Sequence, residues 1–226
     1  MKYTFIIPYR NRNEHLQEFI RRFSQFLQNT DVDAQFYVVH QLHPGEFNRG
    51  ALCNIGFLEC SKIRPDGLFV FHDVDTYPTY WGSIPYDTPK GMVRHAIGLP
   101  HENLGGVCCF WKEDFERVNG FPNYWGWGIE DVTLRCRVHD ARIPIDETNI
   151  VDLNDITKCE MPSHKRNLKK EEQSATQNKE LHHQERRSGD IRNGIQTLEY
   201  QVISTLEIAP RFTVLNVNFQ VQVEKK

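Results

Sequence analysis

The first 75 residues alternate between short apolar runs and amphipathic stretches, and no other feature limits the possible folds so strongly. Residues 3–8 and 34–41 are apolar runs of strand length, and a third run, 68–72, follows a Pro-Asp-Gly turn. Between these runs, residues 13–27 and 48–60 place apolar side chains at helical spacing. Strands that alternate with helices in this way predict an α/β fold, with a mostly parallel central sheet and flanking helices.

After residue 80 the pattern is less regular. Residues 119–128 are rich in aromatic residues and glycine, which argues against a regular element. Residues 164–192 are almost entirely polar, which predicts a solvated helix, a mobile loop, or both. The remaining predicted strands span 91–96, 105–111, 197–204 and 211–221, and the remaining predicted helices span 112–119 and 130 to about 139.

Composition and charge exclude several classes of protein. The 226 residues carry a net charge of -3, so nothing indicates nucleic acid as a partner. No stretch approaches the roughly 20 apolar residues of a membrane span, and the N-terminus is not a signal peptide. The cysteines form no C-x-x-C pair, which predicts reduced thiols used in packing: Cys53, Cys60, Cys108, Cys109, Cys136 and Cys159.

Charged side chains follow two of the predicted strands at their carboxyl ends, where an open α/β sheet binds its ligands. Arg10 and Arg12 follow the first strand, and their forked guanidinium groups suit a phosphate. Asp73 and Asp75 follow the third strand, and carboxylate oxygens suit Mg²⁺ or Mn²⁺. A divalent ion that bridges a carboxylate and a diphosphate is the usual way to hold a nucleotide leaving group. The alternatives are a solvated helix start and an ordinary acidic loop.

Two predicted helix starts also carry candidate groups. Asn48 and Arg49 open the second helix, where the helix dipole and the arginine favour an anion, although Asn is also a plain N-cap. Glu130 and Asp131 open a later helix, directly after a stretch that includes Trp127. Aromatic rings beside carboxylates suit a sugar, and such a carboxylate can act as a general base. The alternative is a helix with favourable acidic residues in its first turn, preceded by core tryptophans.

In this order the motifs resemble the β-1,4-galactosyltransferase family over residues 3 to 219. The family segments P-[FY]-R-x-R, F-N-R-A-x-L-x-N-V-G-F, D-V-D and W-G-W-G-x-E-D are present as PYRNR, FNRGALCNIGF, HDVD and WGWGIED, and GIQTLEYQV echoes a further segment. HDVD, FLECS and TVLNV are most similar to the branch that galactosylates xylose on proteoglycan linkers. The resemblance implies a GT-A, Rossmann-like fold and a metal-dependent inverting transfer of galactose from UDP-galactose to the 4-hydroxyl of an acceptor sugar.

The resemblance also implies a role for each matching residue. Asp131, with Glu130, would be catalytic and would take the proton of the acceptor hydroxyl. Mn²⁺ or another divalent cation would bind Asp75, Met161 and His164, of which the last two are a weak pair when taken alone. The acceptor would contact Tyr124, Gly128, Ile129, Glu130 and Asp131. The donor UDP-sugar would contact Pro8, Tyr9, Arg10, Asn11, Arg12, Phe47, Asn48, Arg49, Asp73, Val74, Asp75, Trp127, His164 and Arg166.

Two residues depart from the family pattern. Val132 replaces a third acidic residue, and Asn103 replaces a tyrosine that limits the 2-substituent of the donor sugar. Asn103 is therefore a candidate for donor selectivity, and UDP-N-acetylgalactosamine or UDP-glucose is the alternative donor. A binding module for a sugar nucleotide or glycan, without turnover, is an alternative from another class. A structural protein is a third alternative, in which the Asp and Trp clusters belong to the core and to helix caps.

We expect a single GT-A domain over residues 1–226. Residues 1–80 would form its nucleotide-binding half and 81–165 its acceptor and metal half, followed by a polar segment at 165–192 and C-terminal strands at 193–226. No signal or membrane anchor is visible, which predicts a soluble, cytoplasmic enzyme of a bacterium or virus. If the chain is an excised domain of a longer protein, the Golgi lumen is the expected compartment.

Overall fold

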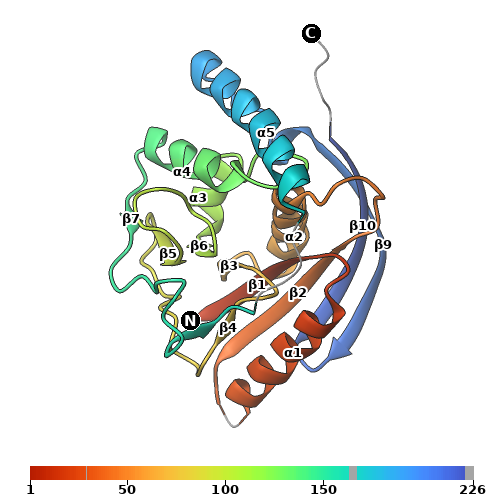
Figure 1. Cartoon of the computed structure of the whole chain (residues 1–226). Helices are drawn as coiled ribbons and strands as arrows, with labels where there is room; N and C mark the ends of the chain where they lie inside the picture. The colour runs from red at the N-terminus through yellow and green to blue at the C-terminus, as the bar shows by residue number, and fades with distance from the viewer. Residues whose placement is uncertain (29, 163–166, 222–226) are drawn as a thin grey trace.

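The computed structural model describes residues 1–28, 30–162 and 167–221. Within these residues an eight-stranded sheet runs in the order β7-β5-β6-β3-β1-β2-β10-β9, and a small second sheet pairs β4 with β8 (Figure 1). The strands are β1 Lys2–Tyr9, β2 Asp33–Gln41, β3 Leu68–His72, β4 Tyr77–Pro78, β5 Val93–Ile97, β6 Val107–Phe110, β7 Ile145–Asp146, β8 Cys159–Glu160, β9 Leu198–Ala209 and β10 Phe212–Val221. The helices are α1 Asn13–Leu27, α2 Arg49–Ile63, α3 Lys112–Arg117, α4 Glu130–Asp140, α5 Leu168–Ser188 and the 3-10 turn η1 Ile195–Thr197.

The centre of the large sheet is parallel, as the alternation of strands and helices predicts. β1 pairs in parallel with β2 and β3, and β2 pairs in parallel with β10. The antiparallel pairs lie on either side of this centre, where β6 joins β3 to β5 and where β9 joins β10 in a long hairpin. The fold prediction is therefore confirmed, and the carboxyl ends of β1, β2 and β3 open on one edge of the sheet.

Each face of the sheet is covered by helices, because successive residues of a strand point to opposite faces. Phe5 packs with Phe19 and Phe23 of α1 in one buried cluster. Its neighbour Ile6 packs in the other cluster, which includes α2. A methyl group on Gly56 of α2 would lie 2.5 Å from Cγ2 of Ile6, so only glycine lets this helix approach β1 so closely.

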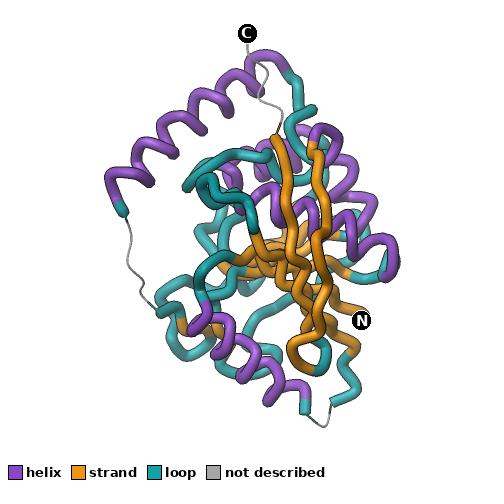
Figure 2. Tube along the Cα trace, turned by 90° about the vertical axis from the view of Figure 1, so that its right-hand side faces the viewer, coloured by secondary structure: helices purple, strands orange, loops and turns teal. Residues whose placement is uncertain are grey.

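The polar stretch after residue 166 forms the long helix α5, which Figure 2 shows as a separate arm beside the sheet. Asn167 begins it with a side-chain cap on the amide of Lys170, and Gly189 ends it in the left-handed conformation. Its buried residues are polar, so it has no apolar stripe that would predict its packing. Glu185 instead receives two hydrogen bonds from Arg137 of α4, at 2.7 and 2.6 Å.

The thiols behave as the composition predicts. Five of the six cysteines are buried and the sixth, Cys136, is half-buried, and all six are free. Burial raises the pKa of Cys53 to about 12, so this thiol stays protonated and inert. Among the helices that the structure describes, none has the length and apolar composition needed to cross a membrane.

Candidate active site

Two arginine–aspartate pairs lie at the carboxyl ends of β1 and β3. Arg12, between β1 and α1, has its Nη1 3.2 Å from Oδ2 of Asp75. Arg49, the first residue of α2, donates from Nε to Oδ1 of Asp73 at 2.7 Å. The two carboxylates therefore pair with arginines from different parts of the chain, and Val74 between them is buried in the turn that follows β3. The structure brings together both strand-end motifs that the sequence singles out.

The start of α2 combines a plain helix cap with a candidate anion site. Oδ1 of Asn48 accepts from the amide of Ala51 at 2.9 Å, so the simple capping explanation is confirmed. The same side chain donates to the carbonyl of Asn123 at 3.1 Å, which links α2 to the aromatic loop, residues 119–128. Arg49 is different, because its Nη1 and Nη2 are buried and have no hydrogen-bond partner among the described residues. Unsatisfied buried guanidinium nitrogens are costly, and an oxyanion would satisfy both.

Arg49 also connects this edge of the sheet to the acidic pair on α4. Burial lowers the pKa of Arg49, but the charges of Asp73, Cys53 and Glu130 and the hydrogen bond to Asp73 together outweigh it and hold the pKa well above the usual range. Burial raises the pKa values of both Glu130 and Asp131, and the charge of Arg49 partly opposes this increase. Its guanidinium lies 5.4 Å from the centre of the Phe121 ring. One buried cation thus interacts with the strand-end Asp73 and with the helix-start carboxylates together.

Glu130 and Asp131 occupy the first turn of α4 and are held in a low-dielectric setting. Burial raises the pKa of Glu130 to about 7, with a further increase from the charge of Asp131. Burial also raises the pKa of Asp131. Oδ1 of Asp131 accepts from the amide of Val132 at 2.8 Å, while a methyl group on Gly105 would lie 2.5 Å from its Oδ2. A carboxylate with a raised pKa is suited to accept a proton.

The aromatic loop before α4 is conformationally strained and partly exposed. Trp127 exposes 55% of its surface, and Gly128 follows it with a φ of 95°. Ile129 has a φ of 77°, which is rare for a β-branched side chain and typical of functional loops. Nδ2 of Asn178 on α5 donates to the carbonyls of Trp125 and Gly128, at 3.1 and 3.0 Å. Helix α5 thus fixes the loop that carries Trp127.

The two predicted site residues Asn103 and Tyr124 lie in different surroundings. Asn103 lies in the loop between β5 and β6, where its Oδ1 accepts from the amide of Gly105, and this loop faces Asp131. Tyr124 is only 3% exposed, and its ring is buried beneath the loop beside α4 and α5. The predicted contact between Tyr124 and an acceptor sugar stays a prediction, and in this arrangement the buried ring offers little surface for it.

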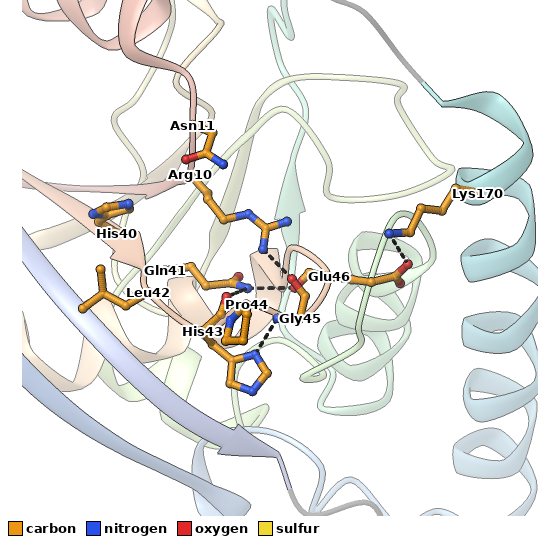
Figure 3. Close-up of a pocket in the computed structure, with 10 residues that line it drawn as sticks. All are labelled: Arg10, Asn11, His40, Gln41, Leu42, His43, Pro44, Gly45, Glu46 and Lys170. Carbon is orange, nitrogen blue, oxygen red and sulfur yellow. Dashed lines mark hydrogen bonds and ion pairs between the residues drawn. The ribbon is translucent and has the colours of Figure 1, made fainter.

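A pocket of about 690 Å³ lies beyond the ends of β1 and β2 (Figure 3). Nη1 of Arg10 donates to the carbonyl of Gly45, and its guanidinium lies 5.7 Å from the centre of the Phe47 ring. Glu46 and Lys170 close one side as an ion pair at 3.1 Å. The lining residues are Arg10, Asn11, His40, Gln41, Leu42, His43, Pro44, Gly45, Glu46 and Lys170. Of these, only Arg10 and Asn11 were predicted, because the segment 40–46 carries no motif of its own.

The expected metal ligands are only partly within the described structure. Asp75 is half-buried at the strand end and Met161 exposes 41% of its surface, whereas His164 and the donor contact Arg166 lie outside the described residues. Among the described residues, no group of three His, Cys, Asp or Glu side chains is arranged to hold a metal ion. A hard carboxylate oxygen beside an anion site suits Mn²⁺ if diphosphate oxygens complete the coordination. His72 is fully buried in the core, where burial lowers its pKa to about 4.

Comparisons with known proteins bear directly on this arrangement. A family model described as the N-terminal region of glycosyl transferase group 7 matches residues 1–81, and one described as the N-terminal domain of galactosyltransferase matches residues 96–165. The chain is 35% identical to β-1,4-galactosyltransferase 4 of Cricetulus griseus over 95% of its length, and 34% identical to β-1,4-galactosyltransferase 1 of Bos taurus over 96%. It spans 62% and 54% of the lengths of these two relatives.

Solved structures agree with the fold. The catalytic domain of Drosophila β-1,4-galactosyltransferase 7, in complex with xylobiose, matches with a TM-score of 0.76 at 25% identity and covers 99% of this chain and 95% of its own. A mutant of the same protein, in complex with manganese, UDP-Gal and xylobiose, matches with a TM-score of 0.77 at 24% identity and the same coverage. The relatives named here are animal proteins, so they give no support to a bacterial or viral source. The matching models and relatives show that the chain belongs to glycosyl transferase group 7, the family of the β-1,4-galactosyltransferases.

Proposed function

We propose that the chain is a metal-dependent inverting glycosyltransferase that moves galactose from UDP-galactose to the 4-hydroxyl of an acceptor sugar. The observation that carries this proposal is the position of Arg49. Its two terminal guanidinium nitrogens are buried without a hydrogen-bond partner among the described residues, and its charge interacts with Asp73, Glu130 and Asp131. A diphosphate leaving group would satisfy these nitrogens, and the acidic pair beyond them is suited to an attacking hydroxyl.

The arginines and the pocket of Figure 3 support the assignment of the nucleotide end. Arg10 lines this pocket, and its guanidinium lies over the ring of Phe47, which precedes α2. A flat base could stack there and a ribose could be enclosed. Arg12 and Arg49 lie nearer the aspartates and would take the phosphate charge. The helix dipole of α2 adds to this preference for an anion.

Asp131 would act as the general base. Its raised pKa lies nearer to neutral pH than that of a solvated aspartate, and this improves proton transfer at working pH. As the acceptor oxygen attacks C1 from the face opposite UDP, the proton passes to Asp131 and the bond from C1 to the diphosphate oxygen breaks. Glu130 would hold the acceptor by a hydrogen bond, and Trp127 would cover the donor and exclude water.

Mn²⁺ is the cofactor that the donor set favours. Asp75 and Met161 would hold it among the described residues, with His164 as the expected third protein ligand. When bound, the ion would neutralise charge on the departing diphosphate. Arg12 is close enough to Asp75 to orient this carboxylate toward the ion.

Two finer points of the substrate, the acceptor and the donor sugar, lead to direct tests. The Drosophila relative binds xylobiose, so a β-xyloside is the first acceptor to examine. Asn103 favours UDP-N-acetylgalactosamine as the alternative donor, because asparagine is smaller than the tyrosine usual in the family. If the chain is part of a longer protein, the Golgi lumen is the proposed compartment.

The experiment is a donor panel with the purified chain, UDP-galactose, UDP-N-acetylgalactosamine and UDP-glucose, each with a β-xyloside or a simple hexose acceptor. UDP release that needs both an acceptor and Mn²⁺, and that stops with a chelator, is the expected result. UDP binding without release from any donor would contradict the proposal and favour a binding module.

A further inference from the structure

A polar network lies behind the loop that faces Asp131. Its centre is Glu147, which directly follows β7. Oε1 of Glu147 accepts from Nη1 of Arg135 at 2.8 Å and from the amide of His101 at 3.0 Å, and it lies 3.2 Å from Nδ1 of His95. Burial raises the pKa of Glu147, but the hydrogen bonds from His101, Arg135 and His95 and the charge of Arg135 together outweigh it and lower the pKa to about 2. Glu147 is thus a fully charged acceptor at neutral pH.

Two partners of Glu147 extend this network to the loop between β5 and β6. His95 is fully buried, and its Nε2 lies 3.1 Å from the carbonyl oxygen of Gly105. Arg135 of α4 donates from Nη1 to the carbonyl of Asn103 at 3.3 Å. His95 and Arg135 therefore hold the carbonyls of Gly105 and Asn103, and Glu147 in turn holds His95 and Arg135. The strands β5, β6 and β7 and helix α4 lie on one side of the molecule (Figure 1).

The loop 98–106 packs against Asp131 with no free space between them. The amide of Leu104 donates to the carbonyl of Asp131 at 3.2 Å. A methyl group on Gly105 would lie 2.5 Å from Oδ2 of Asp131, and one on Gly98 would lie 2.4 Å from Nε2 of His95. Each of these contacts is closer than a Cβ atom allows. A small displacement of the loop would therefore move the Asp131 carboxylate or open a gap beside it.

We propose that Glu147 is a positioning residue for the general base. Through His95 and Arg135 it holds the loop 98–106 against Asp131, and so fixes the carboxylate that takes the proton from the acceptor. This inference rests on the proposed function. Glu147 touches neither the arginines nor the aspartates at the strand ends, so its effect falls on transfer and not on nucleotide binding.

The test compares Glu147→Gln with Glu59→Gln. Glutamine keeps the size of the side chain but removes the charge that Arg135 and His95 share. Glu59 is a matched control, because it is also a partly buried carboxylate with a lysine and a tyrosine partner, and it lies on α2 facing β9. For each variant we would measure the stoichiometry and Kd of UDP binding with Mn²⁺, the kcat for transfer, and the thermal midpoint.

The expected result for Glu147→Gln is a kcat reduced tenfold or more, with UDP stoichiometry unchanged and Kd within twofold. Glu59→Gln should leave the stoichiometry and Kd of UDP binding and the kcat unchanged, and should alter at most the thermal midpoint. If stoichiometry and kcat fall together in Glu147→Gln, or if kcat does not fall, the positioning role is wrong. If Glu147→Gln does not fold, Arg135→Lys receives the same measurements and the same two criteria. Absence of turnover in the unchanged protein overturns the proposed function itself, and the positioning role with it.

Discussion

Arg49 binds Asp73 through its Nε alone, at 2.7 Å, and leaves both terminal nitrogens buried without a partner among the described residues. A charged group in such a setting is destabilising unless a ligand completes its hydrogen bonds. The pair therefore favours an anion at the start of α2 more strongly than the helix dipole does. The two ends of this helix offer a direct comparison, because Arg64 at its C-terminal end makes a similar pair with Asp33.

We expect Arg49→Lys to weaken UDP binding by about 10- to 100-fold, since lysine cannot supply the two vacant nitrogens and a charge-assisted hydrogen bond contributes roughly 1.5–3 kcal/mol. Arg64→Lys is the control and should leave the Kd for UDP unchanged. Isothermal titration of both variants with UDP and Mn²⁺ checks this. Equal affinities in the two variants would show that the Arg49 nitrogens do not contact the diphosphate.

Asp131→Asn should reduce the kcat for transfer by about 100- to 10,000-fold, the range typical of a general base. UDP binding should stay within twofold, because the amide keeps the shape of the side chain. Asp140→Asn, at the other end of α4, removes a carboxylate that pairs with Arg186 far from the site, and serves as the control. Initial rates at saturating donor and acceptor decide the question, and a normal kcat in Asp131→Asn would exclude this residue as the base.

The acidic pair also predicts how stability depends on pH. The pKa of Glu130 is about 7 in the folded chain, above its ordinary value near 4.5, so the folded state binds the proton more tightly than the unfolded state. The resulting stabilisation is complete below about pH 4.5 and is lost as the pH rises through 7. Glu130→Gln cannot titrate, so its thermal midpoint should fall less between pH 5 and pH 7.5 than that of the unchanged protein. Parallel curves for the two proteins would mean that Glu130 is ionised normally.

Much of this site could be predicted from sequence, because its parts follow regular elements. Asp75 and Arg12 were found at strand ends, and Asp131 at a helix start beside tryptophans. The role of Glu147 could not be predicted from the sequence, because its partners His95 and Arg135 are distant in sequence. A lone Glu after a short strand also carries no pattern. The packing of α5 was missed for a related reason. Its buried face is polar, and hydrogen bonds such as that from Asn178 to the Trp127 loop leave no periodic signal.

Removal of the metal should abolish transfer, and Asp75 should set how much metal is needed. Asp75→Asn weakens a hard, charged oxygen ligand, so the concentration of Mn²⁺ for half-maximal rate should rise at least tenfold. Asp66→Asn is the control, because Asp66 is an exposed carboxylate paired with Lys2 on the surface. Rates measured across a Mn²⁺ titration separate this effect from a loss of kcat. An unchanged Mn²⁺ requirement in Asp75→Asn would assign the metal to other ligands.

A single methyl group tests the contact between the loop 98–106 and the general base. Gly105→Ala would place a Cβ atom 2.5 Å from Oδ2 of Asp131, which is closer than real contacts permit, so the carboxylate must move. We expect transfer to fall at least tenfold while UDP binding persists. Gly67→Ala is the matched control, because its Cβ would come no nearer than 3.0 Å to any atom, the nearest being Oγ1 of Thr4, in a turn before β3. Neither glycine has the positive φ that would add backbone strain, so the comparison isolates the steric effect. Full transfer activity in Gly105→Ala would show that Asp131 tolerates displacement, and that the close packing of this loop is not needed for the reaction.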